Sequence, residues 1–61
     1  MLTIETRYYI MQKNDEIMRK TGINAPQDLE TAALTAIEQY GEYAIDEIYN
    51  AIDETANELM K

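Results

Sequence analysis

The sequence predicts a small all-α protein, a three-helix bundle with helices over about residues 3–21, 25–40 and 42–60. Two glycines and one proline are the strong breaks in the chain, and they divide it into three segments. In each segment apolar residues recur three and four positions apart, which is the spacing of one helix face. We therefore expect residues 1–61 to form a single helical domain.

The first segment fits a helix that ends at Gly22. Glycine readily adopts the left-handed conformation with which many helices end, and Arg19 and Lys20 carry the positive charge that suits a helix C-terminus. Asp15 is expected to pair with Arg19, four residues later. The expected apolar face consists of Ile4, Tyr8, Met11 and Met18, with Ile10 and Ile17 beside it.

A strand remains an alternative for residues 2–10, because every second side chain from Leu2 to Ile10 could face one way. A short helix would then run from residues 14–16 to Gly22. This order of a strand and two helices loosely resembles the layout of ribbon–helix–helix DNA-binding dimers. The outward residues of such a strand would be Thr3, Glu5, Arg7 and Tyr9. As a set they are poorly suited to contact phosphate, which needs cations, and the negative net charge also opposes this alternative.

The second segment predicts a helix over about 25–40. Asn24 can cap its start, Pro26 is tolerated in the first turn, and Asp28 suits the positive end of the helix dipole. The apolar face is narrow and rich in alanine, so a neighbouring helix can approach closely. Its residues are Leu29, Ala32, Ala33, Ala36, Ile37 and Tyr40, with Leu34 outside it.

The third segment has the clearest helical pattern, over about 42–60, and it ends near Lys61. Its apolar face consists of Ile45, Ile48, Tyr49, Ile52, Ala56, Leu59 and Met60. Its other face is acidic, with Glu42, Asp46, Glu47, Asp53, Glu54 and Glu58. Glu42, Asp46 and Glu47 lie nearest the helix N-terminus, where the positive end of the helix dipole stabilises negative charge.

Gly41 determines how the second and third helices are arranged. At about 100° per residue, their apolar faces would point about 140° apart on one straight helix. A turn at Gly41 brings the two faces together as an antiparallel hairpin, and this is the arrangement we expect. The alternative is an unbroken helix of about 35 residues, roughly 50 Å long, which only a second copy could cover.

Small size and missing residue types limit the chemistry of the chain. Sixty-one residues bury only a thin core, and small scaffolds usually need a further source of stability, such as disulfides, a metal ion or a partner subunit. The chain has no Cys and no His, which excludes disulfides and the common metal centres, so we expect no metal, no cofactor and a homodimer. Without Ser as well, the usual nucleophilic triads cannot be built. We do not expect an enzyme.

The charge is strongly negative and unevenly distributed. Twelve acids against five bases give −7, and nine acids against one base give −8 for residues 22–61 alone. This surface is expected to attract a basic protein and not to bind nucleic acid directly. No apolar run is long enough to cross a bilayer and the N-terminus does not resemble a signal peptide, so we expect a cytoplasmic protein without membrane contact.

Tyrosines complete the expected binding surface. Tyr8, Tyr40 and Tyr49 fall on expected core faces, whereas Tyr9 and Tyr43 point away from them. Exposed tyrosine is enriched at interfaces, since it offers a large area at low entropic cost. The expected partner-binding residues are Glu42, Tyr43, Asp46, Glu47, Asn50, Asp53 and Glu54.

These observations favour a small acidic regulator or inhibitor, of the kind that phages and plasmids encode. It would dock its acidic helix face on a basic partner surface, for example on a nucleic-acid enzyme, by imitating nucleic-acid charge. One alternative is a structural helical subunit that self-assembles, which the thin core supports. The other is the ribbon–helix–helix DNA-binding dimer.

Overall fold

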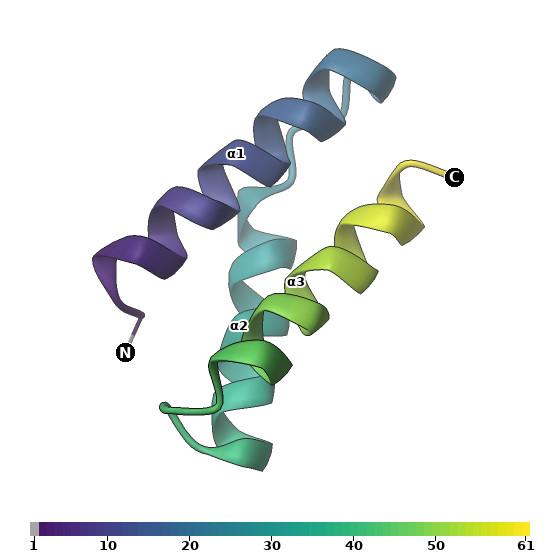
Figure 1. The fold of residues 1–61 in the computed structure, drawn as a ribbon. Helices are drawn as coiled ribbons and strands as arrows, with labels where there is room; N and C mark the ends of the chain where they lie inside the picture. The colour runs from purple at the N-terminus through teal and green to yellow at the C-terminus, as the bar shows by residue number, and fades with distance from the viewer. Residues whose placement is uncertain (1) are drawn as a thin grey trace.

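A computed structural model describes residues 2–61 and confirms the three helices. They are α1 (Ile4–Thr21), α2 (Pro26–Tyr40) and α3 (Ile45–Leu59). No strand occurs in residues 2–61, so the strand alternative for residues 2–10 is wrong and the ribbon–helix–helix layout is absent. In Figure 1, α1 and α3 run side by side in the same general direction, and α2 returns behind them.

Local signals explain both ends of α1. The Thr3 hydroxyl accepts a hydrogen bond from the backbone N–H of Thr6 at 3.1 Å, which satisfies one of the free donors at the helix start. At the other end Gly22 adopts the left-handed conformation, with φ 78°, and its N–H donates to the carbonyl of Met18. The predicted stop at Gly22 is confirmed.

The predicted cap of α2 is wrong. The residue before Pro26 is Ala25, and the Asn24 side chain does not cap the helix. Instead Oδ1 of Asn14, on α1, accepts a hydrogen bond from the backbone N–H of Ala25, with 2.8 Å between the nitrogen and the oxygen. Nδ2 of the same side chain donates to Oδ1 of Asn24 at 2.9 Å. The start of α2 is therefore held by a neighbouring helix, through a contact that local sequence patterns do not reveal.

The turn expected at Gly41 is confirmed. Gly41 has φ 93° and ψ 160°, a region that is almost restricted to glycine, and its N–H donates to the carbonyl of Ile37 at 2.8 Å. The chain reverses over residues 41–44, and α2 and α3 form the expected hairpin. The predicted start of the third helix at about residue 42 is wrong, because α3 begins only at Ile45. Glu42 and Tyr43 therefore lie in the turn that precedes the helix.

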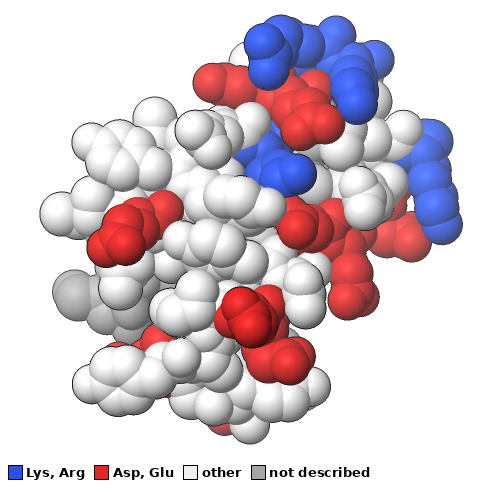
Figure 2. All heavy atoms as spheres, viewed as in Figure 1, with Lys and Arg blue, Asp and Glu red and all other residues white. Residues whose placement is uncertain are grey.

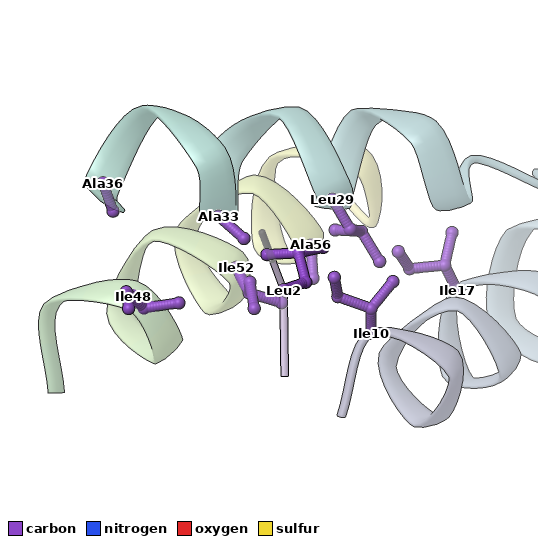
Figure 3. Close-up of a cluster of buried hydrophobic side chains, with 9 residues drawn as sticks. All are labelled: Leu2, Ile10, Ile17, Leu29, Ala33, Ala36, Ile48, Ile52 and Ala56. Carbon is purple, nitrogen blue, oxygen red and sulfur yellow. The ribbon is translucent and has the colours of Figure 1, made fainter. Parts of the chain in front are cut away.

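The core lies between the three helices (Figure 3). The packing of α2 on α3 is the most extensive, and α1 covers both. The predicted faces of α2 and α3 are confirmed except at their ends, where Tyr40 is 58% and Ile45 is 47% exposed. The buried apolar residues are Leu2, Ile10, Ile17, Leu29, Ala33, Ala36, Ile48, Ile52 and Ala56.

The predicted apolar face of α1 is confirmed for Ile10 and Ile17, which are buried, but it is wrong for its other four residues. The helix buries Thr6 and Asn14 together with the two isoleucines. Two of these are polar, and they can be buried because each is hydrogen-bonded. The four side chains that were expected inside form an exposed line, which we call the α1 stripe: Ile4 (70% exposed), Tyr8 (62%), Met11 (59%) and Met18 (42%).

Candidate partner-binding surface

An open groove of about 400 Å³ runs between α2 and α3. Small side chains on both helices leave it open, and Ala36 of α2 is itself almost fully buried at 3% exposure. On the α3 wall the lining residues are spaced three and four apart, so they share one helix face. The α3 wall contains Glu47, Asn50, Ala51, Glu54 and Thr55, and the α2 wall contains Ala32, Thr35, Ala36, Gln39 and Tyr40.

A second hollow adjoins this groove at the turn. It is lined by residues 43–47, and Glu47 lines both hollows, so the two are neighbours on the surface. Tyr43 is 88% exposed at its edge, with Asp46 in the first turn of α3 beside it. Glu42 is also exposed, in the same turn. Six of the seven predicted binding residues therefore lie exposed on α3 and the turn before it, and three of them line the main groove.

The acids of this surface have few basic neighbours. Of the nine acids in residues 22–61, Asp53 pairs with Lys13 at 3.5 Å and Glu58 pairs with Lys61 at 3.1 Å. Within residues 2–61 the other seven form no ion pair. On the face drawn in Figure 2, the visible Lys and Arg side chains lie in the upper and right-hand parts of the view, and only acids are seen among the charged side chains of the lower part. The groove carboxylates of Glu47 and Glu54 are among these seven unpaired acids, so the groove should attract cations.

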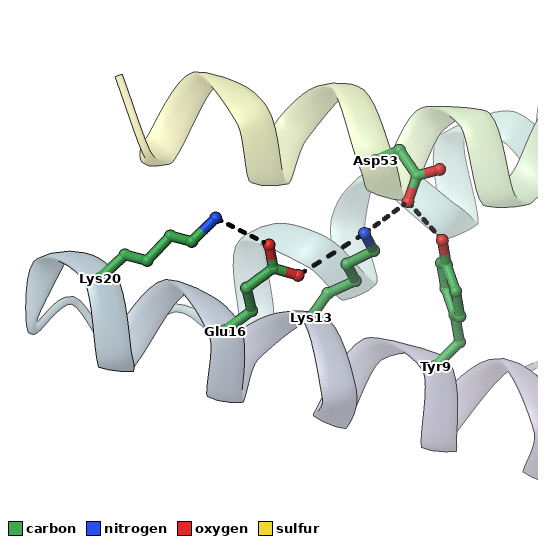
Figure 4. Close-up of polar contacts among 5 residues, drawn as sticks. All are labelled: Tyr9, Lys13, Glu16, Lys20 and Asp53. Carbon is green, nitrogen blue, oxygen red and sulfur yellow. Dashed lines mark hydrogen bonds and ion pairs between the residues drawn. The ribbon is translucent and has the colours of Figure 1, made fainter.

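Asp53 differs from the other predicted binding residues, because its carboxylate contacts side chains of α1. Its carboxylate accepts a hydrogen bond from the Tyr9 hydroxyl and pairs with Lys13 (Figure 4). Tyr9 was expected to point away from the core, yet its ring stacks on that of Tyr49, with centroids 4.4 Å apart. These contacts join α1 to α3, so Asp53 has a structural role in the fold.

The ion pair predicted between Asp15 and Arg19 is absent from residues 2–61. Glu16 is the acid of α1 that is paired, with Lys20 at 3.2 Å and Lys13 at 3.8 Å (Figure 4). The hydrogen bond from Lys20 and the charge of Lys13 lower the pKa of the Glu16 carboxyl. Lys13 stands between Glu16 and Asp53, so one ammonium serves carboxylates on two helices.

The polar contact between α1 and α3 predicts a pH dependence of stability. The hydrogen bond to Asp53, together with burial and the charge of that carboxylate, raises the pKa of Tyr9 to about 12. Since the folded pKa lies above the unfolded value of 10.0, the contribution is complete below pH 10 and is lost as pH rises towards 12. We expect a loss of about 1 kcal/mol in the free energy of unfolding, because the contact lies near the surface, where water screens it.

Urea denaturation at a series of alkaline pH values measures this loss. Tyr9→Phe removes the titrating hydroxyl, so the variant should be less stable below pH 10 but flatter between pH 10 and 12. An identical slope for both proteins would show that the Tyr9 hydroxyl does not contribute.

Sequence reasoning missed the α2 wall of the groove. The helical position of Tyr40 matches the apolar face and predicts burial, but α2 ends there and the ring is largely exposed. Thr35 and Gln39 lie between the apolar and polar faces of α2, so the spacing pattern does not identify them. The position of Tyr40 directly before Gly41 is the signal that could have identified it.

The chain matches no protein-family model, and no curated protein or solved structure matches it. Among residues 2–61, no three acidic side chains converge in a way that could hold a metal ion. None of the helices in the described part of the chain combines the length and apolar character that a bilayer crossing requires.

Proposed function

We propose that this chain is a small acidic regulator or inhibitor that binds a protein partner and has no catalytic activity of its own. The groove between α2 and α3 would receive a basic segment of the partner. The observation that carries the proposal is the pair of groove carboxylates, Glu47 and Glu54, which lack ion-pair partners within residues 2–61. The exposed ring of Tyr40 lines the same groove, and the exposed ring of Tyr43 lines the neighbouring hollow together with Glu47.

The groove matches the chemistry of a lysine or arginine side chain. The methylenes of such a side chain could lie over the alanines of the groove, while its charged end meets Glu47 or Glu54. Hydrogen bonds between a cation and a carboxylate are stronger than neutral ones, particularly the two-pronged bonds of arginine. Tyr43 would add contact area at the rim, and its ring could also take a cation on its face.

A nucleic-acid enzyme is the partner class that this charge distribution suits best. Proteins that bind nucleic acid present rows of cations to phosphate. The excess of eight negative charges over residues 22–61 could occupy such a row in place of the nucleic acid. A cytoplasmic role in a phage or plasmid context accords with these features and forms part of the proposal.

Two matched double variants test the groove. Glu47→Gln with Glu54→Gln removes two groove charges, and Glu30→Gln with Glu38→Gln removes two exposed charges of α2 that do not line it. The wild-type chain is first used to capture a partner from a host lysate, and the purified partner is then titrated with each variant. We expect the groove variant to bind about tenfold more weakly, which corresponds to about 1.4 kcal/mol, and the control to stay within about threefold.

The salt dependence of binding completes this test. Affinity should fall as ionic strength rises, because charges at an open groove are screened. Equal weakening by both double variants would indicate a general effect of net charge, and unchanged binding by the groove variant would place the partner elsewhere. Either result would refute the proposed groove.

A further inference from the structure

We propose that the α1 stripe is the surface through which two copies of this chain pair, with their α1 helices antiparallel and Met11 at the twofold axis. The stripe consists of Ile4, Tyr8, Met11 and Met18, all 42–70% exposed. Scattered exposed apolar residues are normal on a protein surface, but a continuous line of large ones marks an interaction site. This interface is independent of the groove between α2 and α3.

The spacing of the stripe fits a partner helix. Ile4, Met11 and Met18 are seven residues apart, and positions seven apart drift by only about 20° around an α-helix. The three side chains therefore form a nearly straight line, about 21 Å long at 1.5 Å per residue. A second helix lying along this line could contact all of them, whereas a loop or a small ligand would cover only one or two.

The charge distribution selects a second copy as the occupant. Residues 2–21 carry four bases and three acids, a sum of +1, whereas residues 22–61 sum to −8. Two copies that meet through α2 or α3 would bring acidic surfaces together, which is unfavourable. Pairing through α1 keeps those surfaces apart, since α1 is the one helix of the three without excess negative charge.

Arg7 and Asp15 select the antiparallel orientation. They lie four residues before and four residues after Met11, and neither takes part in an ion pair within residues 2–61. In a parallel pair each would stand level with its own counterpart, so like charges would meet. In an antiparallel pair centred on Met11, Arg7 stands level with Asp15 of the second copy, and Ile4 stands level with Met18. Opposite charges then attract at both ends.

Tyr8 extends this complementarity. At about 100° per residue, Tyr8 and Asp15 lie on the same side of the line through Met11. In the antiparallel pair they therefore face each other across the interface, where the Tyr8 hydroxyl can donate to the carboxylate of Asp15 in the second copy. Its 62% exposure within one chain leaves the ring free for this contact.

Sedimentation equilibrium of the full chain over a range of concentrations tests the pairing. The wild-type mass should approach twice that of one chain, and Met11→Glu should remain a monomer with unchanged helical circular dichroism, because residue 11 is 59% exposed and outside the core. Ile45→Glu, at an exposed apolar position of α3, is the control and should still dimerise. A wild-type monomer at all concentrations, or a dimer that persists in Met11→Glu, would overturn the proposal.

A charge exchange tests the orientation. Arg7→Asp alone should weaken the dimer, because two acids then stand level at each end of the interface. Combining it with Asp15→Arg restores opposite charges and should restore dimerisation. If the double variant stays as weak as Arg7→Asp alone, the antiparallel register is wrong.

Discussion

Leu29→Ala is expected to destabilise the fold by about 3 kcal/mol, the largest effect of any single truncation considered in this protein. Leu29 is fully buried, at 0% exposure, between α2 and the two other helices. Truncation removes apolar contacts and leaves a cavity that a thin core cannot easily fill. A single core of this size seldom supplies more than about 3–5 kcal/mol, so most of the stability should be lost.

Leu34 provides a control of the same residue type on the same helix. It is 39% exposed, so Leu34→Ala should cost less than about 1 kcal/mol. Thermal denaturation followed by circular dichroism compares both variants, and a 1 kcal/mol difference should shift the midpoint by roughly 4–8 °C in a domain of this size. Similar midpoints for the two variants would show that the packing described around Leu29 is incorrect.

Asn14→Ala is expected to destabilise the fold by about 2 kcal/mol, although it removes only a small polar side chain. Its Oδ1 is the acceptor for the N–H of Ala25 at the start of α2, and the residue is only 8% exposed. Alanine would leave that N–H without its protein partner, and it would also break the link from α1 to Asn24. The helix pair α1 and α2 should loosen first.

Two further variants identify the group responsible. Asn14→Asp keeps an oxygen acceptor for the N–H of Ala25 and should retain more stability than Asn14→Ala. Asn24→Ala removes a side chain that does not cap α2, so it should cost less than about 1 kcal/mol. Urea midpoints measure all three, and a larger loss for Asn24→Ala than for Asn14→Ala would contradict the capping described.

Much of the fold could be predicted because its signals are local. Gly22 and Gly41 end helices through their own backbone conformations, and the apolar spacing of α2 and α3 follows from packing on one side. The buried face of α1 could not be predicted in this way. The number of apolar side chains favoured the line through Met11, whereas the burial of Asn14 depends on hydrogen bonds to Asn24 and Ala25 that form only in the folded chain.

The candidate site was predictable to a similar degree. Helical spacing was sufficient to place Glu47, Asn50 and Glu54 on the exposed side of α3, which forms one wall of the groove. The opposite wall comes from α2, and which of its residues face α3 depends on the angle at which the helices meet. The direction of the Asp53 side chain could not be predicted for the same reason, because its hydrogen-bond partner Tyr9 is 44 positions away in the chain.

The backbone conformation of Gly41 has a consequence for the topology of the molecule. With φ 93°, the turn suits glycine and strains other residues, for which the helical region would be easier. If residue 41 became helical, α2 would continue into α3 as one rod, and the apolar face of α3 would leave its own chain. Two such chains could then exchange α3, as in domain swapping. Because glycine has no side chain, Gly41 can keep this turn, and the turn keeps α3 packed on α2 of the same chain.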